Sequence, residues 1–126
     1  MIDFNNANAF FAKLKLVRNE IFFSQVAPFF VSGEYIVSCF QGIRDGVVFT
    51  NKRIISINVQ GVTGKKRDYT TLPYSKIQAY SVETAGVLDT DSELDLWFSG
   101  LGKVRFEFTS KTNITEICKV ISGYVL

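Results

Sequence analysis

Residues 49–59 carry the pattern that most restricts how this chain can fold. Ile55, Ile57 and Val59 stand at alternate positions, and this period of two predicts a β-strand with the three side chains on a buried face. Asn51, just before this strand, tolerates the positive φ that a tight corner often requires. The stretch therefore predicts two strands that meet at a corner, in a fold built mainly of β-sheet.

The composition fits one ordered domain without a catalytic centre. The chain has 126 residues, of which 47% are hydrophobic and twelve are Phe, so it can bury a substantial core. Its net charge of +2 gives no strong field for nucleic acid or a membrane. The sequence contains no His, which removes the commonest general base and metal ligand. We therefore expect no enzymatic activity, no cofactor and no nucleic-acid partner.

The start of the chain and its cysteines indicate a cytoplasmic protein. Residues 1–6 lack the basic start and the long apolar stretch of a signal peptide. No window of about 18 apolar residues could span a bilayer. Cys39 lies in an apolar run and Cys118 on the apolar face of a C-terminal helix, so both are expected to be free thiols.

The N-terminal residues 1–32 are predicted to form a helical extension. Within residues 5–26 apolar side chains recur at helical spacing, at Phe10, Leu14, Val17 and Ile21. Pro28 is expected to end this helix. Two interpretations are open, a helix that binds a membrane surface and a helix that packs on the domain or on another subunit. The second is favoured, because the basic face of the helix is weak.

Residues 34–44 predict a long strand that has apolar side chains on both faces. These side chains are Tyr35, Val37 and Cys39 on one face and Ile36 and Phe40 on the other. We expect the outer face to be covered, either by the N-terminal helix or by a neighbouring chain. The dipeptide Asp45-Gly46 that follows is typical of a type I′ hairpin turn.

The rest of the chain predicts a C-terminal helix capped by Asn113, and four strands at 67–72, 77–84, 94–98 and 104–108. The acidic residues 89–93 are similar to a calcium loop, but Leu94 stands where that loop requires glycine, so no metal site is expected. Trp97 alternates with inward-facing residues and therefore points outward. A three-residue turn at 100–102 would place Trp97 opposite Arg105, where ring and guanidinium can stack.

Several short motifs together resemble the bacterial pleckstrin-homology-like domain family, the bacterial PH domains. They are the corner 49–55, the loop 60–66, Leu72-Pro73-Tyr74, and the segments 81–86 and 91–97. The resemblance covers residues 33–126. It implies a mainly β fold, a PH-like barrel of two near-orthogonal antiparallel sheets capped by a C-terminal α-helix. The N-terminal helical segment 1–32 is then an addition to that domain.

The resemblance also implies a non-catalytic protein-interaction module that forms ring-like homo-oligomers, with a pentameric ring as the expected form. The partner is then the chain itself, and an unidentified protein or peptide is a further one. Apolar outward positions and their neighbours give a candidate oligomer interface, Tyr35, Val37, Trp97 and Arg105. The less favoured alternative is weak binding of an anionic lipid or membrane surface through basic residues, Lys52, Arg53, Lys65, Lys66 and Arg67.

Overall fold

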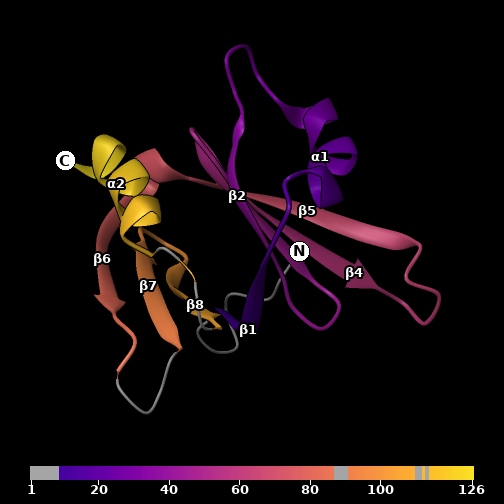
Figure 1. Cartoon of the computed structure of the whole chain (residues 1–126). Helices are drawn as coiled ribbons and strands as arrows, with labels where there is room; N and C mark the ends of the chain where they lie inside the picture. The colour runs from indigo at the N-terminus through magenta and orange to yellow at the C-terminus, as the bar shows by residue number, and fades with distance from the viewer. Residues whose placement is uncertain (1–8, 87–90, 110–111, 113) are drawn as a thin grey trace.

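The computed structural model describes residues 9–86, 91–109, 112 and 114–126, which form a sheet with one α-helix after the first strand and another at the C-terminal end (Figure 1). The strands are β1 (Ala9–Val17), β2 (Ile36–Gln41), β3 (Gly46–Thr50), β4 (Arg53–Gln60), β5 (Lys66–Pro73), β6 (Ile77–Glu83), β7 (Ser92–Phe98) and β8 (Gly102–Phe108). The helices are α1 (Glu20–Val26), α2 (Ile114–Val125) and two short 3-10 helices, η1 (Ala27–Phe29) and η2 (Tyr74–Lys76).

The strands follow one another in a single curled sheet, in the order β5-β4-β3-β2-β1-β8-β7-β6. Neighbouring strands are antiparallel, except that β1 and β8 are parallel. The sheet curls into a half-barrel, with β2 to β5 in one half and β6 to β8 in the other, and α2 covers one end (Figure 1). The predicted fold class is confirmed: mainly β, with a C-terminal helix and an N-terminal helical segment.

Strand β1 corrects the prediction of a helix over residues 5–26, which is wrong for residues 9–17. Helix begins only at Glu20. The pairing register of β1 shifts between Phe11 and Leu14, where Lys13 has a φ of 53°. This bulge turns Phe11 and Leu14 to the same buried side although they are three residues apart. A helix face produces the same spacing, so the bulge imitates a helical pattern in the sequence.

The bulge also lets β1 join the two halves of the sheet. Up to Leu14, β1 pairs in parallel with β8, as in the pairs of Phe11 with Phe106 and of Leu14 with Phe108. After Leu14, β1 pairs with β2, from Lys15 opposite Gln41 to Val17 opposite Cys39. The described part of the predicted extension 1–32 is therefore a central strand of the sheet, followed by α1.

The main core fills the inside of the half-barrel. Its side chains come from all eight strands and from the apolar face of α2, where Ile114, Ile117 and Ile121 are buried as the sequence pattern predicts. The Asn113 cap lies outside the described residues. Tyr74 in η2 is fully buried, and its hydroxyl donates to the carbonyl oxygen of Thr50 at 2.6 Å.

A second, smaller core lies on the outer face of the sheet, beneath α1. Phe22 and Val26 of α1 pack there on four sheet residues, Cys39, Val48, Ile55 and Ile57. The expected covering of the outer face by the N-terminal helix is thus confirmed. The face assignment in β2 is wrong, because a register shift after Ile36 places Ile36 on the same side as Cys39.

The turn between β2 and β3 differs from the predicted type I′ turn at Asp45-Gly46. The amide of Gly42 donates to the carbonyl of Asp45 at 2.8 Å, so the turn is centred on Ile43 and Arg44. Neither Asp45 nor Gly46 has a positive φ. Gly46 is required for another reason: a Cβ at this position would lie 2.6 Å from Cζ of Phe22 in α1.

Candidate functional site

The corner between β3 and β4, which carries the most characteristic sequence motif, fastens the loop that precedes β2. Asn51 does not have the predicted positive φ. Its Oδ1 accepts from the amide of Tyr35 at 2.9 Å, and its Nδ2 donates to the carbonyl of Gly33 at 3.1 Å. Glu34 accepts from the hydroxyl of Thr50 at 2.7 Å. These bonds give the motif a structural role in holding loop and corner together.

Arg53 completes this corner with a two-pronged ion pair. Its Nε and Nη2 each lie 2.9 Å from a carboxylate oxygen of Glu34, whose side chain is fully buried. The same guanidinium donates to the hydroxyl of Thr71 and to the carbonyl of Phe29. Burial alone would raise the pKa of Glu34, but the hydrogen bonds from Arg53, Thr50 and Val31 outweigh it and the pKa is lowered from 4.5.

The five basic residues of the candidate lipid site fall at two ends of the β4–β5 hairpin. Arg53 pairs with Pro73 at one end, next to Lys52, and Gln60 pairs with Lys66 at the other. Strands of this length place the two ends roughly 23 Å apart. Within the second group, Arg67 donates to Oε1 of Gln25 at 2.6 Å, while Lys65 and Lys66 are exposed. The structure does not bring the five side chains to one place.

The candidate interface residues also lie apart. Tyr35 is 61% exposed in the loop before β2. Trp97 is 36% exposed on the outer face of β7, as alternation predicts, because Leu96 and Phe98 on either side are buried. Its predicted stack on Arg105 is wrong: the three-residue turn begins one residue earlier than predicted, at 99–101, and this places Trp97 opposite Lys103.

Arg105 is bound instead to its own cross-strand neighbour, Asp95. Its Nε lies 2.7 Å from Oδ1 and its Nη2 lies 2.9 Å from Oδ2 of that carboxylate. These hydrogen bonds hold the pKa of Asp95 below its ordinary value. Arg105 is therefore part of a polar cross-strand pair beside Trp97 and not a cover for the indole ring.

Val37 lines an apolar depression that we call the β1–β2–α2 groove. It consists of a pocket of about 190 Å³, which adjoins at Leu16 an open hollow of about 510 Å³. The pocket is lined by Leu16, Val37, Ser38, Phe40, Glu116 and Ile117, and the hollow by Leu16, Val17, Arg18 and Ile21. Leu16 is 50% and Ile21 is 44% exposed, so this groove presents large apolar side chains to its surroundings.

Sequence reasoning placed Val37 at an interface but missed Leu16 beside it. A helix over residues 5–26, as predicted, would not have placed Leu16 on a strand next to β2. In the structure Leu16 pairs with Phe40 of β2 and stands at the border of the groove. The bulge at Lys13 would have had to be recognised first, and nothing in the local sequence indicates a positive φ at a lysine.

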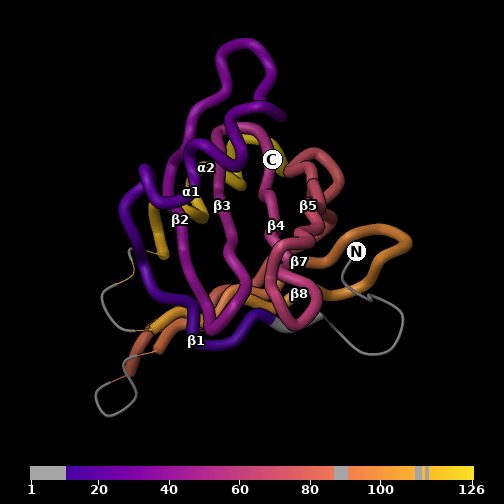
Figure 2. Tube along the Cα trace, turned by 90° about the vertical axis from the view of Figure 1, so that its right-hand side faces the viewer, coloured from indigo at the N-terminus to yellow at the C-terminus, as the bar shows by residue number. Residues whose placement is uncertain are grey.

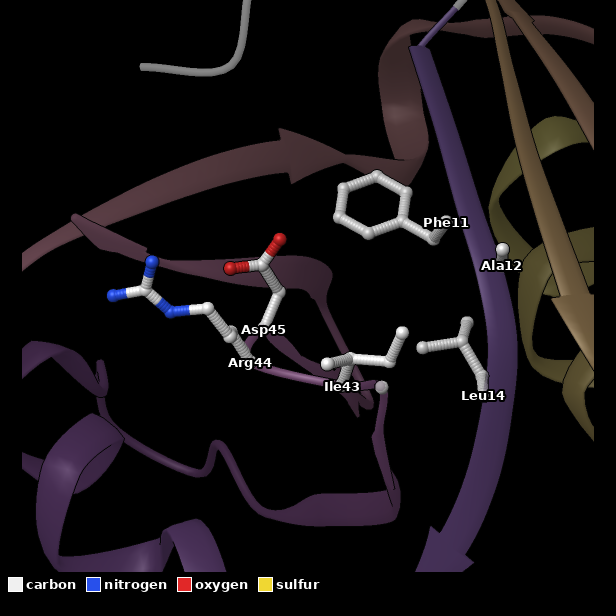
Figure 3. Close-up of a pocket in the computed structure, with 7 residues that line it drawn as sticks. Phe11, Ala12, Leu14, Ile43, Arg44 and Asp45 are labelled. Carbon is white, nitrogen blue, oxygen red and sulfur yellow. The ribbon is translucent and has the colours of Figure 1, made fainter. Parts of the chain in front are cut away.

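A further pocket of about 310 Å³ lies between β1 and the β2–β3 turn. Phe11, Leu14 and Ile43 converge on it, and Arg44 and Asp45 lie at its side (Figure 3). Nη2 of Arg44 donates to the carbonyl of Gly61 at 2.6 Å, and Oδ1 of Asp45 accepts from the amide of Val59 at 3.0 Å. Both charged side chains are therefore engaged in hydrogen bonds to the backbone of neighbouring residues, and the rest of the pocket lining is mainly apolar.

The described residues contain no cluster of three or more His, Cys, Asp or Glu side chains that could hold a metal ion. The acidic segment 89–93, at which no metal site is expected, lies partly outside them, at residues 89 and 90. In the same part of the chain, no helix is long and apolar enough to cross a membrane. Cys39 is buried and Cys118 half-buried, and both are free thiols as predicted. Burial raises the pKa of Cys39 to about 12.

Comparisons with known proteins agree on one family. The profile of the bacterial PH domain matches residues 7–125. The uncharacterized protein YjqA of Bacillus subtilis (strain 168) is 42% identical over 101 residues, which cover 79% of this chain and 81% of that protein. The uncharacterized protein YozO of the same organism is 32% identical over 95 residues, 75% of this chain and 82% of that one.

Solved structures give the same result. A DUF1696 family protein with a pleckstrin-homology domain from Shewanella loihica PV-4 is 38% identical, with a TM-score of 0.76, over 90% of this chain and 98% of that one. A pleckstrin homology domain from Shewanella amazonensis SB2B is 36% identical, with a TM-score of 0.63, over 97% of this chain and 94% of that one.

Proposed function

The chain belongs to the bacterial PH domain family, and from this premise we propose that it is a cytoplasmic, non-catalytic interaction module that assembles into ring-like homo-oligomers. Proteins of the PH-domain family are generally non-catalytic, which agrees with the absence of His from the sequence. The proposed partner is a second copy of the same chain.

The observation that carries the proposal is the exposed apolar surface of the groove. Leu16 and Ile21 are large, about half exposed and adjacent, and Val37 lies beside them. A single chain leaves this surface in water, where its apolar area is unfavourable. Contiguous apolar surface rimmed by polar groups is typical of protein contact sites. Burial against a second copy would remove it from water.

The mass of the protein in solution tests the proposal. We expect light scattering at micromolar concentration to give a multiple of the 14.2 kDa chain mass. Leu16→Asp should reduce that mass, because it places a charge in the proposed contact. Val62→Asp is the matched control, since Val62 is fully exposed in the loop between β4 and β5. A wild-type mass of 14.2 kDa would contradict the proposal.

A further inference from the structure

We propose that the subunit contact is head-to-tail, and that Trp97 of one copy enters the β1–β2–α2 groove of the next. The inference rests on the proposed homo-oligomer and goes beyond it by pairing two different surfaces of the chain. Trp97 is the only tryptophan of the sequence, and it lies near the end of β7, before the turn into β8. Leu101 in that turn is 38% exposed and extends the same apolar end.

The pocket in the groove has the size and lining for such a ring. Its volume is about 190 Å³. A cavity of about 150 Å³ is known to hold a benzene molecule, so this one has room for an aromatic side chain. Leu16, Val37 and Ile117 supply apolar walls from three elements, β1, β2 and α2. Aromatic side chains that fill such pockets commonly dominate the binding free energy of an interface.

An unsatisfied hydroxyl in the pocket matches the polar end of the indole. Oγ of Ser38 is buried and has no hydrogen-bond partner among the described residues. Buried polar groups in folded proteins are normally paired, so a partner for this oxygen is expected. The indole of Trp97 has one N–H donor and no acceptor, and it needs an acceptor once it is buried. Oγ of Ser38 is closed off from water in the single chain, so it can accept that hydrogen bond only when the pocket opens around the ring.

A basic side chain beside Trp97 and an acidic one in the pocket have opposite signs, while the adjoining hollow also carries Arg18. Lys103 is the cross-strand partner of Trp97. Glu116, at the start of α2, lines the pocket. Trp97 in the pocket would bring this ammonium group towards this carboxylate, which favours a second copy of the chain over an acidic partner. Complementary charges of this kind fix the orientation of a contact.

The two surfaces lie on opposite sides of the molecule. In Figure 2 the turn between β7 and β8, drawn in orange, projects to the right, and the second half of β1 runs along the left. One chain therefore cannot place its own Trp97 in its own groove. A surface that fits a different surface of the next copy gives a heterologous contact, which closes into a ring when the rotation between copies allows it.

Fluorescence reports this contact directly, because all tryptophan emission comes from Trp97. We expect the emission maximum of the assembled protein to lie at shorter wavelength than that of Leu16→Asp, whose Trp97 would stay in water. Val62→Asp should keep the wild-type emission. Equal emission of wild type and Leu16→Asp, with the wild type assembled, would contradict the pairing.

A mixing experiment separates head-to-tail contact from a two-fold one. Trp97→Ala keeps the groove and loses the ring, and Leu16→Asp keeps the ring and loses the groove. We expect each variant alone to have the mass of one chain. Their equimolar mixture should form a complex of two chains, in which the Trp97 emission of Leu16→Asp shifts to shorter wavelength. A contact made of one self-complementary surface would leave the mixture monomeric.

The Ser38 hydrogen bond has its own control. Trp97→Phe keeps an aromatic ring but lacks the donor, and we expect it to weaken assembly by about tenfold or less. The same change in a Ser38→Ala background should have almost no effect, because the acceptor is already missing. A wild-type mass of one chain would contradict the proposed function together with the pairing. If the wild type is assembled but the mixture stays monomeric, the pairing is contradicted and the proposed function is not. The same holds if the wild type and the single variants are all assembled.

Discussion

The ion pair of Glu34 with Arg53 stabilises the fold, although the sequence indicates Arg53 as a candidate ligand-binding residue. The carboxylate of Glu34 is buried and accepts from Arg53, Thr50 and the amide of Val31. Four donors, two of them from one guanidinium, compensate the loss of water around this charge. Arg53, which looks like a candidate anion ligand in the sequence, is therefore occupied by an anion of its own chain.

We expect Glu34→Gln to lower the free energy of unfolding at pH 7 by about 3 kcal/mol, because Arg53 would lose its partner. The lowered pKa of Glu34 gives the effect a pH dependence. The ionised form is favoured by folding, so its stabilisation is complete above the unfolded value of 4.5 and is lost as the pH falls through the lower folded pKa. Urea unfolding at several pH values measures it.

The control for this prediction is Glu20→Gln, which changes an exposed carboxylate at the start of α1. It should leave the free energy of unfolding within about 0.5 kcal/mol of wild type. A difference between wild type and Glu34→Gln that stays constant from pH 7 to pH 3 would show that the ionised carboxylate is not what stabilises the corner.

At the scale of elements, the contact of α1 with the sheet depends on a glycine. The ring of Phe22 lies where a side chain at position 46 would be, and Gly46 does not have a positive φ. Backbone conformation therefore permits alanine at position 46, and the close approach of the helix alone opposes it. The Asp45-Gly46 dipeptide indicates a turn in the sequence, but the glycine is needed for packing.

We expect Gly46→Ala to cost about 1–3 kcal/mol, because the new methyl group overlaps the ring of Phe22. In a Phe22→Ala background the same change should cost almost nothing. Urea unfolding of the four proteins of this double-mutant cycle gives the coupling between the two positions. An equal cost of Gly46→Ala in both backgrounds would mean that the clash is not with Phe22.

The sequence predicts those elements in which the hydrophobic pattern and the structure have the same period. In β7 the buried Leu94, Leu96 and Phe98 alternate regularly, and so the outward direction of Trp97 is predictable. Its cross-strand neighbour Lys103 is not predictable, because the register depends on which residues form the turn, and the turn begins one residue earlier than expected. In β1 the bulge at Lys13 breaks the period. The groove needs β1, β2 and α2 together, so no local pattern reveals it.

For the molecule as a whole, β1 decides whether the two halves of the sheet form one structure. It lies between β2 and β8 and pairs with both. It also places Phe11 and Leu14 in the main core, while α1 places Phe22 in the second. A chain without these elements would have two new unpaired strand edges, and such edges favour aggregation.

We therefore expect residues 33–126 alone to fail to fold, although the sequence motifs of the family begin there. Removal of residues 1–32 uncovers the outer face of the sheet at Cys39, Val48 and Ile55. It also opens the main core, because Phe11 and Leu14 are lost from it. Loss of several fully buried large side chains exceeds the stability of a typical domain of this size, about 5–15 kcal/mol. Circular dichroism with urea titration measures the outcome, and a cooperative transition at the midpoint of the full chain would show that residues 33–126 are a domain by themselves.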